Sequence, residues 1–280
     1  MIYTEFMADL WTDLVDCLRL RPLPDTDAGE ALFEGTNQHL EYHRVFGGQL
    51  LAQFLRAAAE RFPDRAVKSM HATFAREGRA DTPMRYRLRT HHAGRSFATV
   101  TILAEQGDTV VATASLSLHT PEDGPARQTV EPIEALPGTE FTRDWSLLPW
   151  EIRATDDLDD TGTAPAEFAF WMRTPEIAAD FAPAVAAYAT DLTLIGTALR
   201  PVDGYAQSGN GTAFLSAVTS HTLWFHREFR VDDWLLLRQH SPVLAHGRCF
   251  GRGDILTAAG TLVASYAQEA LLRLPVPAAG

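Results

Sequence analysis

The stretch from Val45 to Phe62 reads VFGGQLLAQFLRAAAERF, and the rest of the chain is organised around it. Its two glycines permit a tight turn, and the apolar spacing that follows predicts a helix with one buried face; that face comprises Leu50, Leu51, Phe54, Leu55 and Ala58. Three consecutive alanines keep the helix thin, so other backbone can approach it closely. The helix should end at Phe62, because Pro63 follows and the residue before a proline disfavours helical geometry.

The segment after this helix is almost entirely strand-like. Four runs rich in β-forming residues span 67–74, 84–90, 96–105 and 109–119, with glycine in the later turns. In the last run the even-numbered residues from Val110 to Leu118 are apolar, which predicts a half-buried antiparallel strand. A lone apolar helix beside such strands buries its stripe if the sheet wraps around it. The alternative interpretation is an ordinary core helix.

Composition excludes several classes of protein. The chain has 280 residues, 46% of them apolar, which suits one large globular core or two smaller ones. A formal charge of −12 argues against a nucleic-acid partner, and two cysteines predict neither a disulfide framework nor a cysteine metal site. Residues 1–20 carry four acidic side chains and lack the features of a signal peptide. No uninterrupted apolar run approaches the length of a membrane span, so we expect a cytoplasmic protein with no membrane partner.

The chain before and after these elements shows further structure. A helix is expected over residues 5–20, a short strand over 31–35, and a linker within the Pro-rich stretch 121–149. Strands are then expected at 150–155 and 166–173, followed by a helix from Thr174 to about Leu194 that Pro183 should kink or split. The last strands are expected at 219–229, 233–241, 248–257 and 261–272.

The two halves repeat the same order of elements, which predicts hotdog-sized units at 1–125 and 150–280 joined by a linker at 126–149. Three local matches support the repeat: 71–74 with 221–224, 94–97 with 247–250, and 111–116 with 263–268. Chance similarity between strands is the alternative. The third match puts Gln268 where the first half has Leu116, on an apolar face. An amide there needs hydrogen-bond partners, so Gln268 is either a satisfied structural amide or part of a site.

Four motifs together resemble the type II acyl-CoA thioesterases: Val45 to Gln49, Gly94 to Phe97, Trp224 to Arg227, and Val263 to Glu269. The resemblance covers the chain from about Leu32 to Arg273 and implies an α+β double hotdog, in which two long helices are each wrapped by a curved antiparallel sheet. It also implies hydrolysis of acyl-CoA to a free acid and coenzyme A. Hotdog sheets have exposed edges, so a homo-oligomer is expected as well.

The resemblance implies a water-orienting trio in the second half. Asp191, late in the second helix, matches the family aspartate, and Gln268 matches the family glutamine. The family hydroxyl position falls in strict register on Val218, so Thr219 could supply the hydroxyl if the strand slips or bulges, and Ser220 is the other candidate. For each of these residues the alternative is a structural role; Asp191 in particular could be a solvated or capping carboxylate.

Hydrolysis needs a positioned water, a base and donors for the oxyanion. Asp191 could accept the proton, and Gln268 could hold the water by either end of its amide. Backbone N–H groups at Gly47 and Gly48, or at the start of the second helix, are candidate oxyanion donors. Arg95 and Arg248, at the two matched Gly-Arg turns, are candidates for the coenzyme A phosphates, with Arg76 and Arg79 as weaker ones; solvated surface arginines are the alternative.

Other chemistries fit the sequence less well. It has no Gly-x-Ser-x-Gly elbow, which argues against a serine hydrolase. Four histidines between 221 and 246 invite a metal site, but they lie on separate predicted strands without ligand spacing, so we expect no metal and no cofactor. A non-hydrolytic acyl-CoA or lipid binder that lost the hydroxyl remains open, and a hotdog dehydratase ranks last because no convincing Asp and His pair is present.

Overall fold

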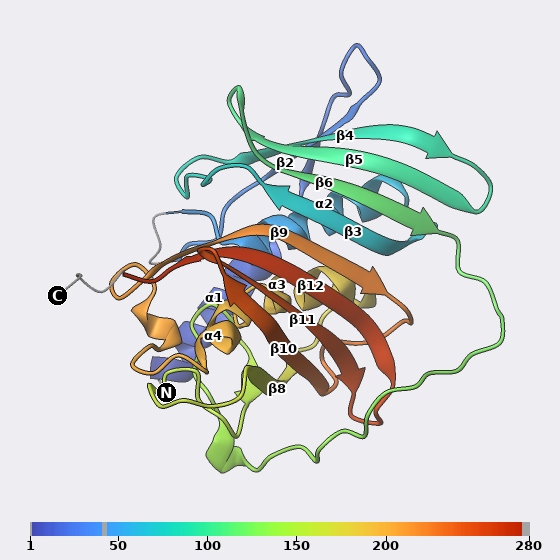
Figure 1. Cartoon of the computed structure of the whole chain (residues 1–280). Coiled ribbons are helices and arrows are strands. Elements are labelled where there is room, and N and C mark those ends of the chain that lie inside the picture. Colours follow the sequence, from blue (N-terminus) through green and yellow to red (C-terminus); the bar gives the residue numbers. More distant parts are fainter. Residues whose placement is uncertain (1, 41–43, 276–280) are drawn as a thin grey trace.

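The computed structural model describes residues 2–40 and 44–275. Twelve strands form one antiparallel sheet in the order β1-β2-β4-β5-β6-β3-β9-β12-β11-β10-β8-β7, curved around the central helices (Figure 1). The helices are α1 (Ile2–Cys17), α2 (Gly47–Arg61), α3 (Ala182–Thr190) and α4 (Leu194–Leu199), with short turns η1 (Thr139–Phe141), η2 (Ala179–Phe181) and η3 (Gln207–Gly209). The strands of the first half are β1 (Arg21–Leu23), β2 (Ala31–Gly35), β3 (Ala66–Phe74), β4 (Met84–Ala93), β5 (Phe97–Gln106) and β6 (Thr109–His119). Those of the second half are β7 (Glu151–Arg153), β8 (Glu167–Arg173), β9 (Leu215–Phe225), β10 (Leu235–Ala245), β11 (Arg248–Thr257) and β12 (Leu262–Arg273).

The two halves meet through their central strands and their helices. β3 pairs with β9, with Met70 opposite Leu223 and Ala72 opposite His221. Inside the curve of the sheet, α2 packs against α3. The predicted apolar stripe of α2 is buried, and Gln49 and Gln53 on the same helix are buried too. The wrapped-helix arrangement expected from residues 45–62 is therefore confirmed.

The second helix begins later than predicted. Thr174 does not cap a helix: its hydroxyl donates to the Pro175 carbonyl, and its N–H donates to Val231. The helix α3 starts at Ala182 with Pro183 in its first turn, where a proline loses no hydrogen bond. Pro183 therefore opens this helix and does not kink it. The stretch Ala179–Leu199 is apolar enough to span a membrane, but 83% of its most apolar window is buried inside the molecule, as in a core helix.

The predicted linker forms a strap over the outer face of the second half. Three of its apolar side chains, Val130, Ile133 and Leu136, pack on Trp171, Leu236 and Leu256. Gln128 fixes its course by donating to the Gly260 carbonyl and accepting from the Leu262 N–H. The strap then turns inward, and Trp145 and Leu147 pack against the main core. This segment therefore contributes apolar contacts to the second half and does more than join two units.

The repeat holds in register at one of the three predicted matches. Met70 on β3 faces inward opposite Leu116 on β6, and His221 on β9 faces inward opposite Gln268 on β12. The inward pair Met70–Leu116 is thus the counterpart of His221–Gln268, as the match of Leu116 to Gln268 predicted. The match of His71 to His221 is wrong, because His71 faces outward opposite Thr222. The match of 94–97 to 247–250 is wrong by two residues. Ala98 pairs with Leu118 in the first half as Cys249 pairs with Ala270 in the second, so Cys249 corresponds to Ala98 and not to Ser96.

Candidate active site

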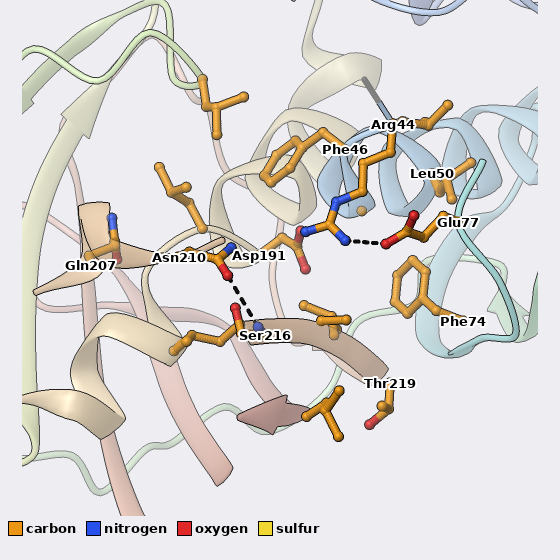
Figure 2. A pocket seen from close by; sticks show the side chains of 18 of the residues that line it. Arg44, Phe46, Leu50, Phe74, Glu77, Asp191, Gln207, Asn210, Ser216 and Thr219 are labelled. Carbon is orange, nitrogen blue, oxygen red and sulfur yellow. Dashed lines mark hydrogen bonds and ion pairs between the residues drawn. The ribbon is translucent and has the colours of Figure 1, made fainter. Parts of the chain in front are cut away.

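A cavity of about 650 Å³ lies where the two halves meet. Its wall combines the start of α2, the segment after β3, the inner end of the strap, the region around α4 and the first residues of β9. Figure 2 shows Asp191 in this wall together with Arg44, Phe74, Asn210 and Thr219. The cavity is therefore built from both halves of the chain.

Asp191 is held at the point where the two central helices touch. It is the C-cap residue of α3, and it accepts a hydrogen bond from the Gly48 N–H at the start of α2. A Cβ on Gly47 would lie 2.7 Å from Asp191 Oδ2, and a Cβ on Gly48 would lie 2.5 Å from the Tyr188 carbonyl oxygen. The glycines are needed for this close approach. The carboxylate thereby sits at the positive end of the α2 dipole.

The environment of Asp191 suits a general base. Burial raises the pKa of its carboxyl from 3.8 to about 7, against the opposing effects of the Gly48 N–H and the Arg44 guanidinium. Among the described residues, its Oδ1 has no hydrogen-bond partner. A buried carboxyl oxygen on a cavity wall, with a pKa near neutrality, can accept a proton from a bound molecule.

Gln268 lies behind the cavity wall in a chain of hydrogen bonds. Its Oε1 is 2.8 Å from His221 Nδ1, and His221 Nε2 is 3.0 Å from the hydroxyl of Thr190, the residue before Asp191. Burial lowers the pKa of His221 to about 4, so its ring is neutral at pH 7. Gln268 Nε2 is buried, and nothing in the described part of the chain hydrogen-bonds to it. The structure therefore links Asp191 and Gln268 through two residues that sequence reasoning did not place in the site.

The hydroxyl candidates separate at a β-bulge. Ser220 pairs with Glu269 and Val218 pairs with Ala270, so Thr219 is the extra residue. Thr219 reaches the cavity wall, but its hydroxyl donates to the Glu269 carbonyl at 3.0 Å. Ser220 does not belong to the part of the wall that the structure describes, whereas Val218 does. The strand therefore has the bulge that would let Thr219 supply a hydroxyl. The position that corresponds in strict register to the family hydroxyl is occupied by the apolar Val218.

Ser216 is a cavity hydroxyl that sequence reasoning missed. It is buried in the wall opposite Leu272, two residues before Val218 and on the same inward face of β9. The backbone N–H of Ser216 donates to Asn210 Oδ1 at 3.1 Å, which fixes the strand at this point. Ser216 and Val218 face inward because the bulge lies at Thr219. The sequence alone does not show where the bulge falls.

The two Gly-Arg turns lie at opposite ends of the molecule. Arg95 lies just before β5, at the end of the sheet where β3 begins. The first residues of β5 and β3 both pair with His119. The cavity, in contrast, lies beyond the last residue of β3. Arg248 pairs with Leu271 of the cavity wall, but its guanidinium lies 3.4 Å from Glu269. Neither Arg95 nor Arg248 belongs to the described wall of this cavity, and their assignment to the coenzyme A phosphates stays a prediction.

Different arginines line the cavity. Arg44 is paired with Glu77, and Arg76 lies exposed at the wall beside it. The weaker candidate Arg79 is exposed and paired with Asp81 at 2.8 Å. Within residues 2–40 and 44–275, no group of three or more His, Cys, Asp or Glu side chains could hold a metal ion.

The raised pKa of Asp191 predicts a pH-dependent stability. The folded state holds this proton up to about pH 7 and the unfolded state only to about pH 4, so the contribution of Asp191 to stability falls as pH rises between these values. Asp191→Asn should remove this dependence. The free energy of unfolding of the variant, relative to the parent, should therefore rise by up to about 4 kcal/mol from pH 4 to pH 8.

Urea unfolding across that pH range measures the difference. Asp108→Asn, in an exposed turn, is the matched control and should run parallel to the parent protein. If the free energy of unfolding of Asp191→Asn runs parallel to that of the parent protein across this pH range, the pKa of Asp191 is not raised.

Comparison with known proteins gives the chain its relatives. Residues 38–119 match the model of the acyl-CoA thioesterase N-terminal domain, and residues 121–272 match that of the acyl-CoA thioesterase C-terminal domain. Acyl-CoA thioesterase 2 of Haemophilus influenzae is 31% identical over 95% of this chain and 99% of its own. Human acyl-coenzyme A thioesterase 8 is 28% identical over 92% of this chain and 88% of its own.

Solved structures agree with these matches. The acyl-CoA thioesterase II TesB2 of Mycobacterium marinum has a TM-score of 0.76 and is 28% identical, covering 94% of this chain and 98% of its own. A hot dog fold protein of Alicyclobacillus acidocaldarius, 17% identical with a TM-score of 0.74 over 94% of this chain and 98% of its own, supports the fold alone. The chain belongs to the type II acyl-CoA thioesterase family, and its two domains form the double hotdog that the sequence predicted.

Proposed function

We propose that this protein hydrolyses acyl-CoA thioesters to a free acid and coenzyme A with a water activated by Asp191. One observation carries the proposal. Asp191 lies in the wall of a cavity that both halves build, and its Oδ1 has no hydrogen-bond partner among the described residues. Family membership supplies the substrate class. A carboxylate whose pKa lies near 7 is deprotonated in a large fraction of molecules at neutral pH and still has affinity for a proton.

The reaction follows from this geometry. Asp191 takes a proton from the water as the water oxygen attacks the thioester carbonyl carbon, and the carbonyl oxygen gains a negative charge. The tetrahedral intermediate collapses with cleavage of the carbon–sulfur bond. The sulfur leaves as a thiolate and takes the proton that Asp191 holds. No covalent acyl-enzyme intermediate is required, and the carboxylate is regenerated.

The cavity wall has an apolar region suited to the acyl chain and an arginine suited to the coenzyme A phosphates. Apolar side chains offer a site for the acyl chain, and they include Phe46, Leu50, Phe74, Trp145 and Leu147. Arg76 lies exposed at the same wall and suits the phosphates of coenzyme A better than Arg95, which precedes β5 at the far end of the strands of the first half.

One observation favours a second function, that of a non-hydrolytic acyl-CoA binder. Val218 stands at the family hydroxyl position, and the hydroxyl of Thr219 is already bonded to Glu269. If that hydroxyl is indispensable, the protein retains the cavity but does not turn over its substrate. Binding without turnover would then be the outcome of the assay below.

Free thiol released from a panel of acyl-CoAs of increasing chain length distinguishes the two functions. A thioesterase releases thiol, and Asp191→Asn should lower kcat by a factor of about 100 to 10,000, because the general base is removed. Thermal unfolding with the same acyl-CoAs should show that the variant still binds. A rise in melting temperature without thiol release by the parent protein would support the binder and overturn the hydrolase.

Gly47→Ala tests the contact between the helices. The new Cβ would lie 2.7 Å from Asp191 Oδ2, so the carboxylate must move. A displacement of this size should lower kcat by about 100-fold. Gly124→Ala is the matched control, because a Cβ at Gly124 meets nothing within 4 Å, and it should have parent activity. Full activity of Gly47→Ala would show that the position of Asp191 is not critical.

Arg76→Ala tests the contact to coenzyme A. Loss of a charge-assisted hydrogen bond should raise KM for acyl-CoA by about tenfold, and the effect should shrink as salt is added. Arg95→Ala should leave KM unchanged, since Arg95 lies at the opposite end of its sheet from the cavity. The reverse result, with Arg95→Ala impaired and Arg76→Ala normal, would refute the assignment.

A further inference from the structure

We propose that Ser216 is a catalytic residue that holds the attacking water together with Asp191. This inference rests on the proposed hydrolase function and names a second group that acts at the same site. It begins from the place of Ser216 on the inward face of β9, where its side chain is buried and lines the cavity. The small surface that Ser216 keeps therefore opens to the cavity.

The hydroxyl of Ser216 is available to a bound molecule. The backbone N–H of this residue donates to Asn210 Oδ1 at 3.1 Å, which fixes the strand, whereas the side-chain oxygen has no hydrogen-bond partner among the described residues. A polar group withdrawn from solvent lowers stability unless a partner satisfies it. A water or a substrate atom in the cavity supplies that partner.

The other hydroxyls of the described cavity wall are bonded or solvated. Thr219 donates to the Glu269 carbonyl at 3.0 Å, and its oxygen lies 3.4 Å from Glu269 Oε1. Figure 2 shows this hydroxyl pointing away from the carboxylate in the wall. Ser146 and Ser208 are both exposed. Within the part of the wall that the structure describes, Ser216 is thus the hydroxyl residue that is both buried and unpaired.

Asp191 and Ser216 belong to the same part of the wall. Figure 2 shows both on the side of the cavity where Asn210 lies, across from Leu50 and Phe74. Asp191 comes from the end of α3, and Ser216 comes from the start of β9. A small molecule between these two elements can contact both side chains.

Two acceptors are what an attacking water needs, because a water molecule carries two protons. Asp191 Oδ1, which has no partner among the described residues, accepts one of them, and Ser216 Oγ accepts the other. The lone pairs of the water oxygen then face the thioester carbonyl carbon. As the new carbon–oxygen bond forms, one proton moves to Asp191, and the second stays on the attacking oxygen and remains bonded to Ser216.

Threonine and valine at position 216 separate the hydroxyl from its packing. The two side chains have nearly the same shape, suit a strand and differ by one hydroxyl. We expect Ser216→Thr to keep kcat within about fivefold of the parent. Ser216→Val should lose about 10- to 100-fold, because the water loses one of its two orienting bonds. KM should change little in both variants, since the bond concerns the water and not acyl-CoA.

A matched pair on another strand controls for the substitutions themselves. Ser115→Thr and Ser115→Val, at an exposed position of β6, should both have the kcat of the parent protein. Melting temperatures identify a variant that fails to fold. If valine does not fit at position 216, Ser216→Ala removes the hydroxyl without adding volume and should show the same loss of kcat.

Two results would overturn the role of Ser216. Equal kcat values for Ser216→Thr and Ser216→Val would show that the hydroxyl is dispensable. A loss of kcat in Thr219→Val that Ser216→Val does not share would assign the hydroxyl to the bulge residue instead.

The failure of this inference differs from that of the proposed function. If the parent protein releases no thiol from any acyl-CoA, the hydrolase and the role of Ser216 fall together. If the parent releases thiol and Ser216→Ala does so with the same kcat, the hydrolase stands and Ser216 is not catalytic.

Discussion

The approach of the α3 C-terminus to the α2 N-terminus is the constraint on which the site depends. Two residues without side chains, Gly47 and Gly48, allow the contact, because any Cβ there would meet Asp191 or the Tyr188 carbonyl within 2.7 Å. The carboxylate is withdrawn from solvent by this packing, and burial raises its pKa. The carboxylate that we propose as the base is therefore positioned by helix packing, and each half supplies one of the two helices.

The duplicated scaffold uses its two halves differently. Asp191 caps α3, but Phe62 stands at the same point of α2. His221 and Gln268 face inward where the first half has Met70 and Leu116. The second half carries Asp191 and the His221–Gln268 pair, and the first half supplies glycines, apolar side chains and the arginines of the cavity wall. This asymmetry explains why a polar residue on an otherwise apolar strand face was informative.

Much of the fold could be predicted because hydrophobic periodicity acts locally. The stripe of α2 and the alternation in β6 led directly to a helix wrapped by antiparallel strands. The predicted cap at Thr174 failed because its hydroxyl found a nearer acceptor in Pro175. Asp191 and Gln268 were proposed as site residues through family resemblance. His221 was not, since nothing local shows that its imidazole lies between Thr190 and Gln268. The sequence could not show that Arg95 lies away from the described cavity wall, because the place of a turn relative to the cavity is set by strand pairing.

The bulge at Thr219 has a consequence for how such strands are compared. One additional residue changes the parity of everything that precedes it on β9, so Ser216 and Val218 face the interior together with His221. A letter-by-letter alignment carries no information about this reversal. Insertion or loss of a single codon upstream of His221 would exchange the inner and outer faces of the strand while leaving its composition almost untouched. Which hydroxyl a relative presents to its substrate is thus decided by strand pairing, and two members with similar motifs can differ in this respect.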